Sequence, residues 1–491
     1  MPIVRSVSGL RSTLDLLTSD LIKNYANAFH LFLPKGKIVI GKDGRPSGAW
    51  IEKTLTEELI KLGRDVVSIG ITPTPTVQLY IKNHNSKNHN SNNNFVEIAG
   101  GVAITASHNP SEWNGLKFLN SDGIFLDENE NNKFWNFLDA DISEKITNHN
   151  SNDFGEIFYI DSAIDEHIER ILDIPFIKNE LKNIQKYNFN VVVDAVNSSG
   201  SVAVIKLLER LNCNYEKLFC DATGIFPHTP EPLPENLTQL CETVKNKIVR
   251  NKNSKNFIGI AVDPDADRLV LIDEDGNCIG EEKTVCIAID SYFTFNNFSN
   301  NNSFQNFATV SSTVTSSIVV NQSTTLLADI IAKNHNAEVF RSAVGEINVV
   351  KKMKETNAKI GGEGSGGVIL SDCHYGRDSL VGIVLVLALL AKKQITLQQL
   401  NKNYPKLEML KFKQEFSGDK NKLYKKIIEQ NSEKIISQID GIKINHEDSW
   451  VHLRTSNTEP IIRIIAEAPT KEQAQKLIDE VLKFVDYTVS T

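Results

Sequence analysis

The sequence predicts an alternating α/β protein whose last part is a smaller α+β unit. Apolar runs rich in β-branched residues end in Gly, Asp or Asn turns and are followed by stretches of helical periodicity, as α/β architecture requires. The length of 491 residues is enough for three or four domains at roughly 100 to 200 residues each. We therefore expect a multi-domain protein in which each domain has its own core.

The repeated units fall into four blocks along the chain. The first opens with KIVIGKDGR near Lys37 and fades near Phe154, and the second runs from VVVDAVNSSG to the strand pair FIGIAVD and RLVLIDEDG. The third contains AKIGGEGSGGVIL and the apolar run LVGIVLVLALLAKK, and the fourth, starting near Tyr404, ends in WVHLRTSNTEPIIRIIAEA and a terminal helix. We predict domains at residues 1–155, 156–280, 281–402 and 403–491.

Composition narrows the class of protein. Hydrophobic residues make up 41% and charged residues 23%, which is typical of globular domains. The net charge of -8 argues against nucleic acid or an anionic membrane as the main partner. The start of the chain lacks a secretory leader pattern, and the most apolar run, 380–391, is too short to cross a bilayer. We expect a cytoplasmic protein, with no membrane or nucleic-acid partner.

Cysteines and asparagine-rich tracts are expected to carry no chemistry. The six cysteines form no CxxC pair and show no Cys/His clustering at zinc spacing, so we expect reduced, structural thiols. The tracts at 83–94 and 296–304 contain too few apolar groups to pack, and we predict solvated loop insertions there.

The segment DPDADR at residues 263–268 places three carboxylates at alternate positions after a predicted buried strand. Carboxylates crowded in this way repel one another unless a hard cation neutralises them. An EF-hand loop is an alternative because Glu274 stands at position 12, but Arg268 replaces the Gly that position 6 requires. We favour a Mg²⁺ site, with positions open for a phosphate, over an EF-hand or a solvated acidic turn.

The segment TASHNP places Ser107 in a turn after the apolar strand GVAI. A turn serine usually bonds its own backbone, so this segment alone also fits a structural turn. A hydroxyl that carries a phosphoryl group needs a nearby cation, which the acidic loop would supply, and Lys117 is a candidate proton carrier.

Two further segments suit a phosphosugar. RTSNTEP, which begins at Arg454 and is followed by Arg463, combines guanidinium, hydroxyl, amide and backbone N–H groups that fit a phosphate dianion. GGEGSGG lacks the Lys-Ser/Thr ending of a P-loop, but its Glu363 and Ser365 are suited to sugar hydroxyls. Each segment taken alone fits a structural turn equally well.

In this order, and one in each block, TASHNP, DPDADR, GEGSGG and RTSNTEP resemble the phosphoserine, metal, sugar and phosphate loops of the α-D-phosphohexomutase superfamily. The resemblance covers nearly the whole chain. Weaker similarities are SGLR, GKDGRPSG, GITPTP, HTPEPLPENL and VGEINV. The resemblance implies four domains: three similar α/β domains with mixed sheets and a smaller C-terminal α+β domain.

The resemblance also implies roles for individual residues. Ser107 would carry the phosphoryl group, and a phosphoserine oxygen would join Asp263, Asp265 and Asp267 in binding Mg²⁺. The other residues implied are Lys117 and His108 for proton transfer, Arg11 and Arg268 near the reacting phosphate, Glu363 and Ser365 for sugar hydroxyls, and Arg454, Ser456, Asn457, Thr458 and Arg463 for the phosphate that is not transferred.

The chain departs from the superfamily pattern at two loops. SGLRS replaces the commoner Gly-Ile-Arg-Gly around Arg11, and GEGSGG has Gly where many members carry His. The SGLR start, GEGSGG and WVHLRTSNTEP together are most similar to phosphoglucosamine mutases, and phosphomannomutase or phosphoglucomutase activity is the alternative.

The expected reaction converts glucosamine 6-phosphate to glucosamine 1-phosphate through a phosphoserine enzyme and a bisphosphorylated sugar, with Mg²⁺ and Arg268 supplying positive charge. The sequence leaves open a monomer or a homodimer. A Mg²⁺-dependent phosphatase and a non-catalytic phosphosugar-binding protein are alternatives. The intact Ser107, Lys117 and three aspartates argue against a pure binder, which needs no nucleophile beside a metal.

Overall fold

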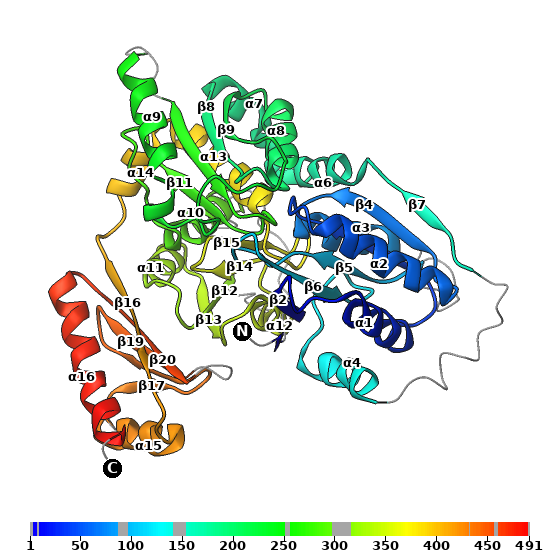
Figure 1. Ribbon diagram of the computed structural model, residues 1–491. Helices are drawn as coiled ribbons and strands as arrows, with labels where there is room; N and C mark the ends of the chain where they lie inside the picture. Colours follow the sequence, from blue (N-terminus) through cyan, green and yellow to red (C-terminus); the bar gives the residue numbers. More distant parts are fainter. Residues whose placement is uncertain are drawn as a thin grey trace, which may run out of the picture. The chain divides into compact units, whose positions relative to one another are not determined.

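A computed structural model describes residues 3–6, 9–86, 97–140, 154–250, 256–296, 316–431, 433–455 and 460–489. The chain forms two compact units, one of residues 1–284 with 366–399 and the other of residues 285–365 with 400–491. Figure 1 shows the chain and labels many of its elements.

The first sheet of the first unit is mixed. Its strands are β1 (Val4–Ser6), β2 (Gly9–Thr13), β3 (Lys37–Lys42), β4 (Val66–Ile71), β5 (Ile98–Ile104), β6 (Trp113–Leu119) and β7 (Ile157–Tyr159). Their order is β1-β2-β6-β5-β3-β4-β7. The pairs β3–β5, β3–β4 and β4–β7 are parallel, whereas β5–β6, β2–β6 and β1–β2 are antiparallel.

Helices cover both faces of this sheet, which explains why its central strands are apolar without alternation. The helices are α1 (Ser19–Phe32), α2 (Gly48–Lys61), α3 (Thr74–Ser86) and α4 (Glu128–Asp139). On β3, Ile38 and Ile40 join the core with Phe29 of α1, whereas Val39 between them joins the opposite core with Val77 of α3.

One sequence prediction is wrong in this region. The tract at 83–94 was predicted to be a loop, but its first four residues complete helix α3. Asn85 there accepts a hydrogen bond from the Ile98 backbone N–H (3.0 Å), and its side-chain amide donates to the Ile98 and Ser121 carbonyl oxygens. These bonds to the sheet offset the low apolar content of the tract. The rest of that tract and most of the second lie outside the described residues.

The second sheet of this unit has the order β11-β10-β8-β9. Its strands are β8 (Asn190–Asp194), β9 (Asn214–Phe219), β10 (Phe257–Val262) and β11 (Leu269–Ile272). Strand β8 is parallel to β9 and β10, and β10 is antiparallel to β11, so the DPDADR segment is the link between β10 and β11. The remaining elements are α6 (Ala163–Leu172), α7 (Pro175–Tyr187), α8 (Gly200–Arg210), the short 3-10 helix η1 (Pro234–Asn236), α9 (Thr238–Arg250), β15 (Gly367–Leu370) and α13 (Ser379–Lys393).

The second unit contains a parallel sheet and an antiparallel sheet. In the first, β13 (Glu338–Ser342), β12 (Ser317–Asn321) and β14 (Ile360–Glu363) lie in that order. The antiparallel sheet has the order β16-β20-β19-β18-β17. Its strands are β16 (Glu408–Glu415), β17 (Ile435–Ser437), β18 (Ile442–Asn445), β19 (Trp450–Thr455) and β20 (Ile461–Ala468).

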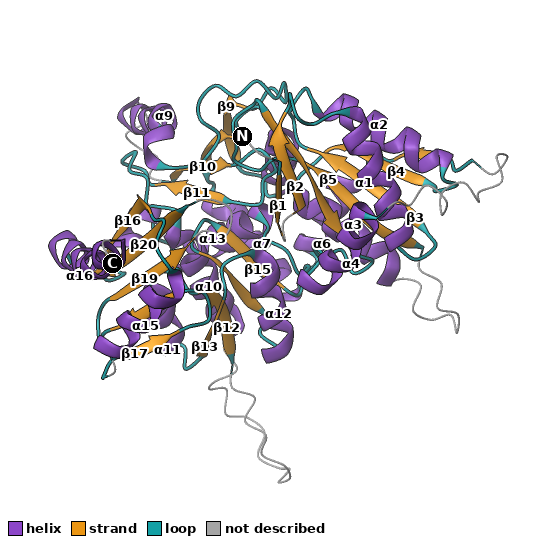
Figure 2. Ribbon diagram, turned by 60° about the horizontal axis from the view of Figure 1, so that its bottom comes forward, coloured by secondary structure: helices purple, strands orange, loops and turns teal. Residues whose placement is uncertain are grey.

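Helices complete this second unit. They are α10 (Glu282–Asn296), α11 (Leu327–Asn334), α12 (Glu346–Thr356), α14 (Leu397–Lys402), α15 (Lys420–Gln430) and α16 (Lys471–Val489), of which α10 and α14 extend across the division between the units. Helices α15 and α16 supply Leu423, Ile427 and Ile478 to the core of the antiparallel sheet (Figure 2). The predicted fold class is confirmed, including the α+β end of the chain.

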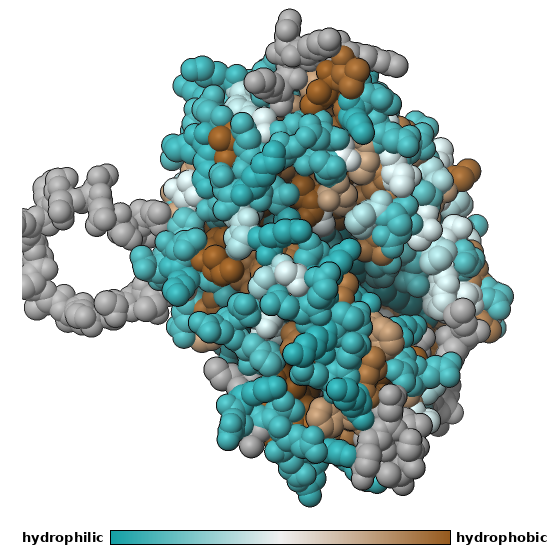
Figure 3. Space-filling view, turned by 90° about the vertical axis from the view of Figure 1, so that its left-hand side faces the viewer, coloured by the Kyte–Doolittle hydropathy of each residue, from teal (hydrophilic) through white to brown (hydrophobic). Residues whose placement is uncertain are grey.

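The face of the molecule that Figure 3 presents is largely polar. Hydrophilic residues predominate there, and the hydrophobic ones form small separate groups. Ile225, Val249 and Ile439 are examples of exposed large apolar side chains. Within the described ranges, no helix has both the length and the apolar character that crossing a membrane requires.

Candidate active site

Ser107 lies three residues beyond the end of β5 and has a left-handed backbone conformation, with φ of 50°. This conformation is uncommon for a residue with a side chain, and surrounding contacts must hold it. The Ser107 N–H donates to Thr105 Oγ1 (2.8 Å), and that hydroxyl donates to Asp43 Oδ2 (2.6 Å). The Ser107 hydroxyl is therefore held in one direction, in which it donates to Asp263 Oδ2 (3.1 Å).

Arg45 fixes the other side of this turn. Its guanidinium donates to the backbone oxygens of Ser107 (2.7 Å) and Asn109, and it forms a buried ion pair with Asp43. Asp43 and Arg45 were not predicted as site residues. The similarity of GKDGRPSG to the superfamily was the available signal for them.

The DPDADR turn is held through its backbone. The Pro264 carbonyl oxygen accepts hydrogen bonds from the hydroxyls of Ser198 and Ser199, both at 2.7 Å. The Ala266 carbonyl oxygen accepts from Ser379 Oγ (2.7 Å), and Ala266 itself has a left-handed φ of 49°. With its backbone fixed, the turn presents its three carboxylates as one group in which one oxygen of each lies within 4.8 Å of one oxygen of the others.

Both oxygens of Asp263 accept hydrogen bonds, whereas Asp265 and Asp267 are each held through Oδ2 alone. Asp265 Oδ2 accepts from Lys117 Nζ (2.6 Å) and Thr74 Oγ1 (2.7 Å), and Asp263 Oδ1 accepts from two backbone N–H groups. Asp265 Oδ1 and Asp267 Oδ1 are buried and accept no hydrogen bond from the described residues. Buried oxygens of this kind fit a hard cation that takes oxygen ligands, so the residues present can hold Mg²⁺.

The pKa values of Asp263 and Asp265 are shifted in opposite directions. Burial and repulsion by Asp267 and Asp265 raise the pKa of Asp263 well above its usual value. Burial acts in the same direction on Asp265, but the ion pair with Lys117 and the hydrogen bonds from Lys117 and Thr74 lower the pKa of Asp265 overall. Without a cation, Asp263 therefore takes up a proton more readily than Asp265 does.

His108, Arg11 and Arg268 also belong to this region. His108 Nδ1 lies 3.3 Å from Ser107 Oγ, and burial, with the positive charges of Arg268 and Arg11, lowers the pKa of His108 to about 2. Its ring is therefore neutral at ordinary pH. Arg11 donates to Asn109 Oδ1 (3.4 Å). The structure thus brings together the predicted residues of the first and second blocks.

The GEGSGG loop lies in the second unit up to Ser365, which is half-buried. Glu363 at the end of β14 is 4% exposed, and its Oε1 accepts from Asn321 Nδ2 and from the Gly345 backbone N–H, both at 2.8 Å. These bonds fix the direction of the carboxylate. Asn321 was not predicted, whereas Gly345 belongs to the VGEINV segment.

Arg454 and Arg463 are direct cross-strand neighbours on β19 and β20. Like charges placed opposite one another are unfavourable, unless an anion joins them. Arg454 Nε lies 3.2 Å from Asp440 Oδ1, and the other Asp440 oxygen accepts from the Val344 backbone N–H (3.0 Å). Ser456, Asn457 and Thr458 lie outside the described residues.

Fold and site together define a multi-domain α/β protein with a directed serine hydroxyl beside a carboxylate site suited to a cation. Family models match four parts of the chain: the phosphoglucomutase/phosphomannomutase alpha/beta/alpha domains I, II and III at residues 4–144, 165–276 and 303–407, and the C-terminal domain at residues 414–484. The chain belongs to the phosphoglucomutase/phosphomannomutase family.

Curated relatives match over nearly their whole length. A phosphoglucomutase/phosphomannomutase of Thermococcus kodakarensis is 34% identical over 91% of this chain and 90% of the relative. A phosphoglucosamine mutase of Methanocaldococcus jannaschii is 29% identical over 92% of each chain. A probable phosphoglucosamine mutase of Pyrococcus horikoshii is 30% identical over 96% of this chain and 95% of the relative.

Solved structures share the fold. A phosphoglucomutase/phosphomannomutase family protein from Burkholderia thailandensis has a TM-score of 0.78 and 22% identity, covering 99% of this chain and 98% of its own. The Aspergillus fumigatus N-acetylphosphoglucosamine mutase, solved in complex with GlcNAc-6P and magnesium, has a TM-score of 0.58 and 13% identity, covering 99% and 96%.

Proposed function

We propose that this chain is a phosphohexomutase that interconverts glucosamine 6-phosphate and glucosamine 1-phosphate through a phosphorylated Ser107. One observation carries the proposal: the Ser107 hydroxyl donates to Asp263 Oδ2, at the edge of a buried group of three carboxylates. A serine in a merely structural turn needs no such neighbours. The relatives named phosphoglucosamine mutases support glucosamine as the sugar.

In the first half-reaction the free hydroxyl of the bound monophosphate attacks the phosphorus on Ser107. The bond between phosphorus and Ser107 Oγ breaks, and one proton passes from the attacking hydroxyl to the leaving oxygen. We assign the transfer of that proton to His108, whose Nδ1 lies 3.3 Å from Ser107 Oγ, and to Lys117, whose Nζ donates to Asp265. The bisphosphorylated sugar then turns over, and its other phosphoryl group returns to Ser107 by the same exchange.

The phosphoryl group that is transferred needs cations beside it, because its equatorial oxygens carry most of its negative charge. Arg11 and Arg268 are the arginines proposed to lie beside it. Mg²⁺, held by Asp263, Asp265 and Asp267, supplies further positive charge to those oxygens when bound.

Recognition of the rest of the substrate is assigned to residues of the segments that resemble the sugar and phosphate loops. We assign the sugar hydroxyls to Glu363 and Ser365. The phosphate that is not transferred is assigned to Arg454, Ser456, Asn457, Thr458 and Arg463. The Arg454–Arg463 pair supports this assignment, because two guanidinium groups on neighbouring strands can both donate to one dianion.

The test combines a substrate panel with matched serine variants. Glucosamine, N-acetylglucosamine, mannose and glucose phosphates are supplied with a catalytic amount of bisphosphate activator. Ser107→Ala should lose several orders of magnitude in turnover and its phosphate adduct in intact-mass analysis. The control Ser111→Ala, an exposed serine four residues on, should keep both. Near-normal turnover of Ser107→Ala rejects the proposal.

The same panel separates two other activities. Faster turnover of mannose or glucose phosphates would assign the activity of the Thermococcus kodakarensis relative, which shares 34% of its residues with this chain. Release of inorganic phosphate to water without isomerisation would assign a phosphatase. We further infer a cytoplasmic monomer or homodimer, and domains at 1–155, 156–280, 281–402 and 403–491.

A further inference from the structure

Arg377 reaches the carboxylate group from outside the segments that resemble the superfamily loops. It lies between β15 and α13, its side chain is 11% exposed, and its Nη2 donates to Asp267 Oδ2 (2.5 Å). Lys117 Nζ lies 3.6 Å from the same oxygen. Two cations thus face one oxygen of Asp267, while the other, Oδ1, lies 3.9 Å from Arg268 Nε, is buried and accepts no hydrogen bond within the described part of the chain.

Gly367 provides the space for the Arg377 side chain. A Cβ atom at Gly367 would lie 2.3 Å from Arg377 Cδ and 2.9 Å from its Cγ, closer than packing permits. In this chain the space beside Gly367 is filled by the arginine, so the two residues depend on one another.

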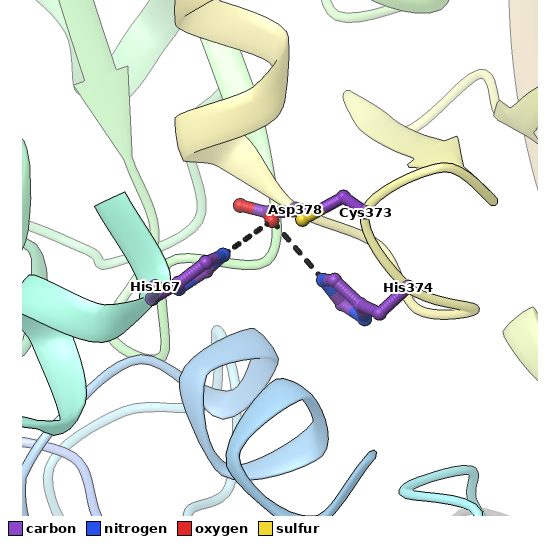
Figure 4. Close-up of side chains that lie close together, drawn as sticks. All are labelled: His167, Cys373, His374 and Asp378. Carbon is purple, nitrogen blue, oxygen red and sulfur yellow. Dashed lines mark hydrogen bonds and ion pairs between the residues drawn. The ribbon is translucent and has the colours of Figure 1, made fainter. Parts of the chain in front are cut away.

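A buried network fixes the backbone next to Arg377. Asp378 Oδ2 accepts from His167 Nε2 (2.8 Å) and His374 Nε2 (3.1 Å), and Figure 4 shows both rings pointing toward this carboxylate. Asp378 Oδ1 accepts from the Leu380 and Val381 backbone N–H groups in the first turn of α13. His167 is itself held at Nδ1 by Thr76 Oγ1 (2.9 Å). A fully buried network of this kind leaves Arg377 little freedom.

We propose that Arg377 is a positioning residue of the metal site: it holds Asp267 Oδ2 so that Oδ1 remains directed toward the cation. Gly367 and the network of Asp378, His167 and His374 hold Arg377 in place. The proposal rests on the proposed function, since it assigns the ligand of the carboxylate group as Mg²⁺. Residues that orient metal ligands typically change metal affinity by about 10- to 100-fold.

The sign of the effect distinguishes orientation from charge. Removing a positive charge beside a Mg²⁺ site would, by Coulomb's law alone, strengthen Mg²⁺ binding. Loss of orientation would weaken it. Arg377→Ala is therefore expected to raise the Mg²⁺ dissociation constant of the purified, dephosphorylated protein by roughly 10- to 100-fold in calorimetry. Arg377→Lys, which keeps the charge but not the planar fork, should fall between the wild type and Arg377→Ala.

A double-mutant cycle tests the link to Gly367, whose backbone lies outside the left-handed region and accepts alanine. Gly367→Ala should weaken Mg²⁺ binding about as much as Arg377→Ala. In the Arg377→Ala background, Gly367→Ala should add little, because nothing remains to be displaced. Additive losses would show that Gly367 acts separately and would overturn its assigned role.

Three results would overturn the assignment of Arg377. Unchanged or stronger Mg²⁺ binding in Arg377→Ala would exclude positioning. A rise confined to the KM for sugar phosphate would instead make Arg377 a substrate contact. If the wild-type protein binds no Mg²⁺, Mg²⁺ is not the ligand of this site and the assignment fails. Binding is measured without turnover, so wild-type mutase activity with failed Arg377 results would refute this inference alone and leave the proposed function intact.

Discussion

Lys117→Met removes the cation at the centre of the carboxylate group. Lys117 is 2% exposed, and its Nζ lies 2.6 Å from Asp265 Oδ2 and 3.6 Å from Asp267 Oδ2. Breaking a buried ion pair by removing one partner typically costs about 3–5 kcal/mol, because the remaining charge stays buried. At about 2–4 °C per kcal/mol for domains of about 150–250 residues, the expected fall in unfolding midpoint is roughly 6–20 °C in EDTA.

Mg²⁺ should restore much of this loss, because a bound cation replaces the missing charge. Thermal unfolding followed in EDTA and in excess Mg²⁺ therefore gives a larger Mg²⁺ stabilisation for Lys117→Met than for the wild type. The control is Lys443→Met. Lys443 is 1% exposed, donates to the Gln322 carbonyl oxygen and lies over the Trp450 ring. The fall in unfolding midpoint caused by Lys443→Met should be the same with and without Mg²⁺. If the fall caused by Lys117→Met is also independent of Mg²⁺, the reasoning is refuted.

Two further substitutions test the site. Folding raises the pKa of Asp263, so the folded state binds a proton more tightly than the unfolded state does. The free energy of unfolding therefore falls as pH rises from the pKa of Asp263 in the unfolded chain to its pKa in the folded protein. Asp263→Asn should therefore raise the unfolding midpoint in EDTA, more at pH 8 than at pH 4, and abolish stabilisation by Mg²⁺; melts at both pH values check this. Arg454→Ala should cost roughly 1.5–3 kcal/mol, about ten- to a hundredfold in kcat/KM, while phosphate on Ser107 remains in intact-mass analysis. Unchanged kcat/KM for every hexose phosphate would make RTSNTEP a structural turn.

The sequence allowed the carboxylate group and Ser107 to be predicted because each lies in a short turn directly after an apolar strand. The distance between them could not be derived from their own segments, since Ser107 and Asp263 are 156 residues apart in the chain. Their proximity was suggested by the resemblance of four segments, in the same order, to the loops of the α-D-phosphohexomutase superfamily. The structure places their side chains in hydrogen-bond contact.

The residues that hold these groups were harder to predict. Thr74 and Asp265 are 191 residues apart, and Asn321 and Glu363 are 42 apart. A threonine or asparagine at the end of a strand or start of a helix is so often a cap that its type carries little information. Arg377 lies in a loop without a motif, and its contact with Asp267 depends on the absence of a side chain at Gly367.

The arrangement of charges links stability to function in this site. Cations and hydroxyls contact the Oδ2 atoms of Asp265 and Asp267, so the Oδ1 atoms of both remain buried without hydrogen bonds among the described residues. Such oxygens destabilise the protein until a cation binds them. Because the Oδ2 atoms are held by the protein and the Oδ1 atoms are left for the cation, the ligands need not reorganise when the cation binds. Electrostatic catalysis of phosphoryl transfer requires such a preorganised site. A substitution at Asp263 that stabilises the metal-free protein should therefore also weaken metal binding.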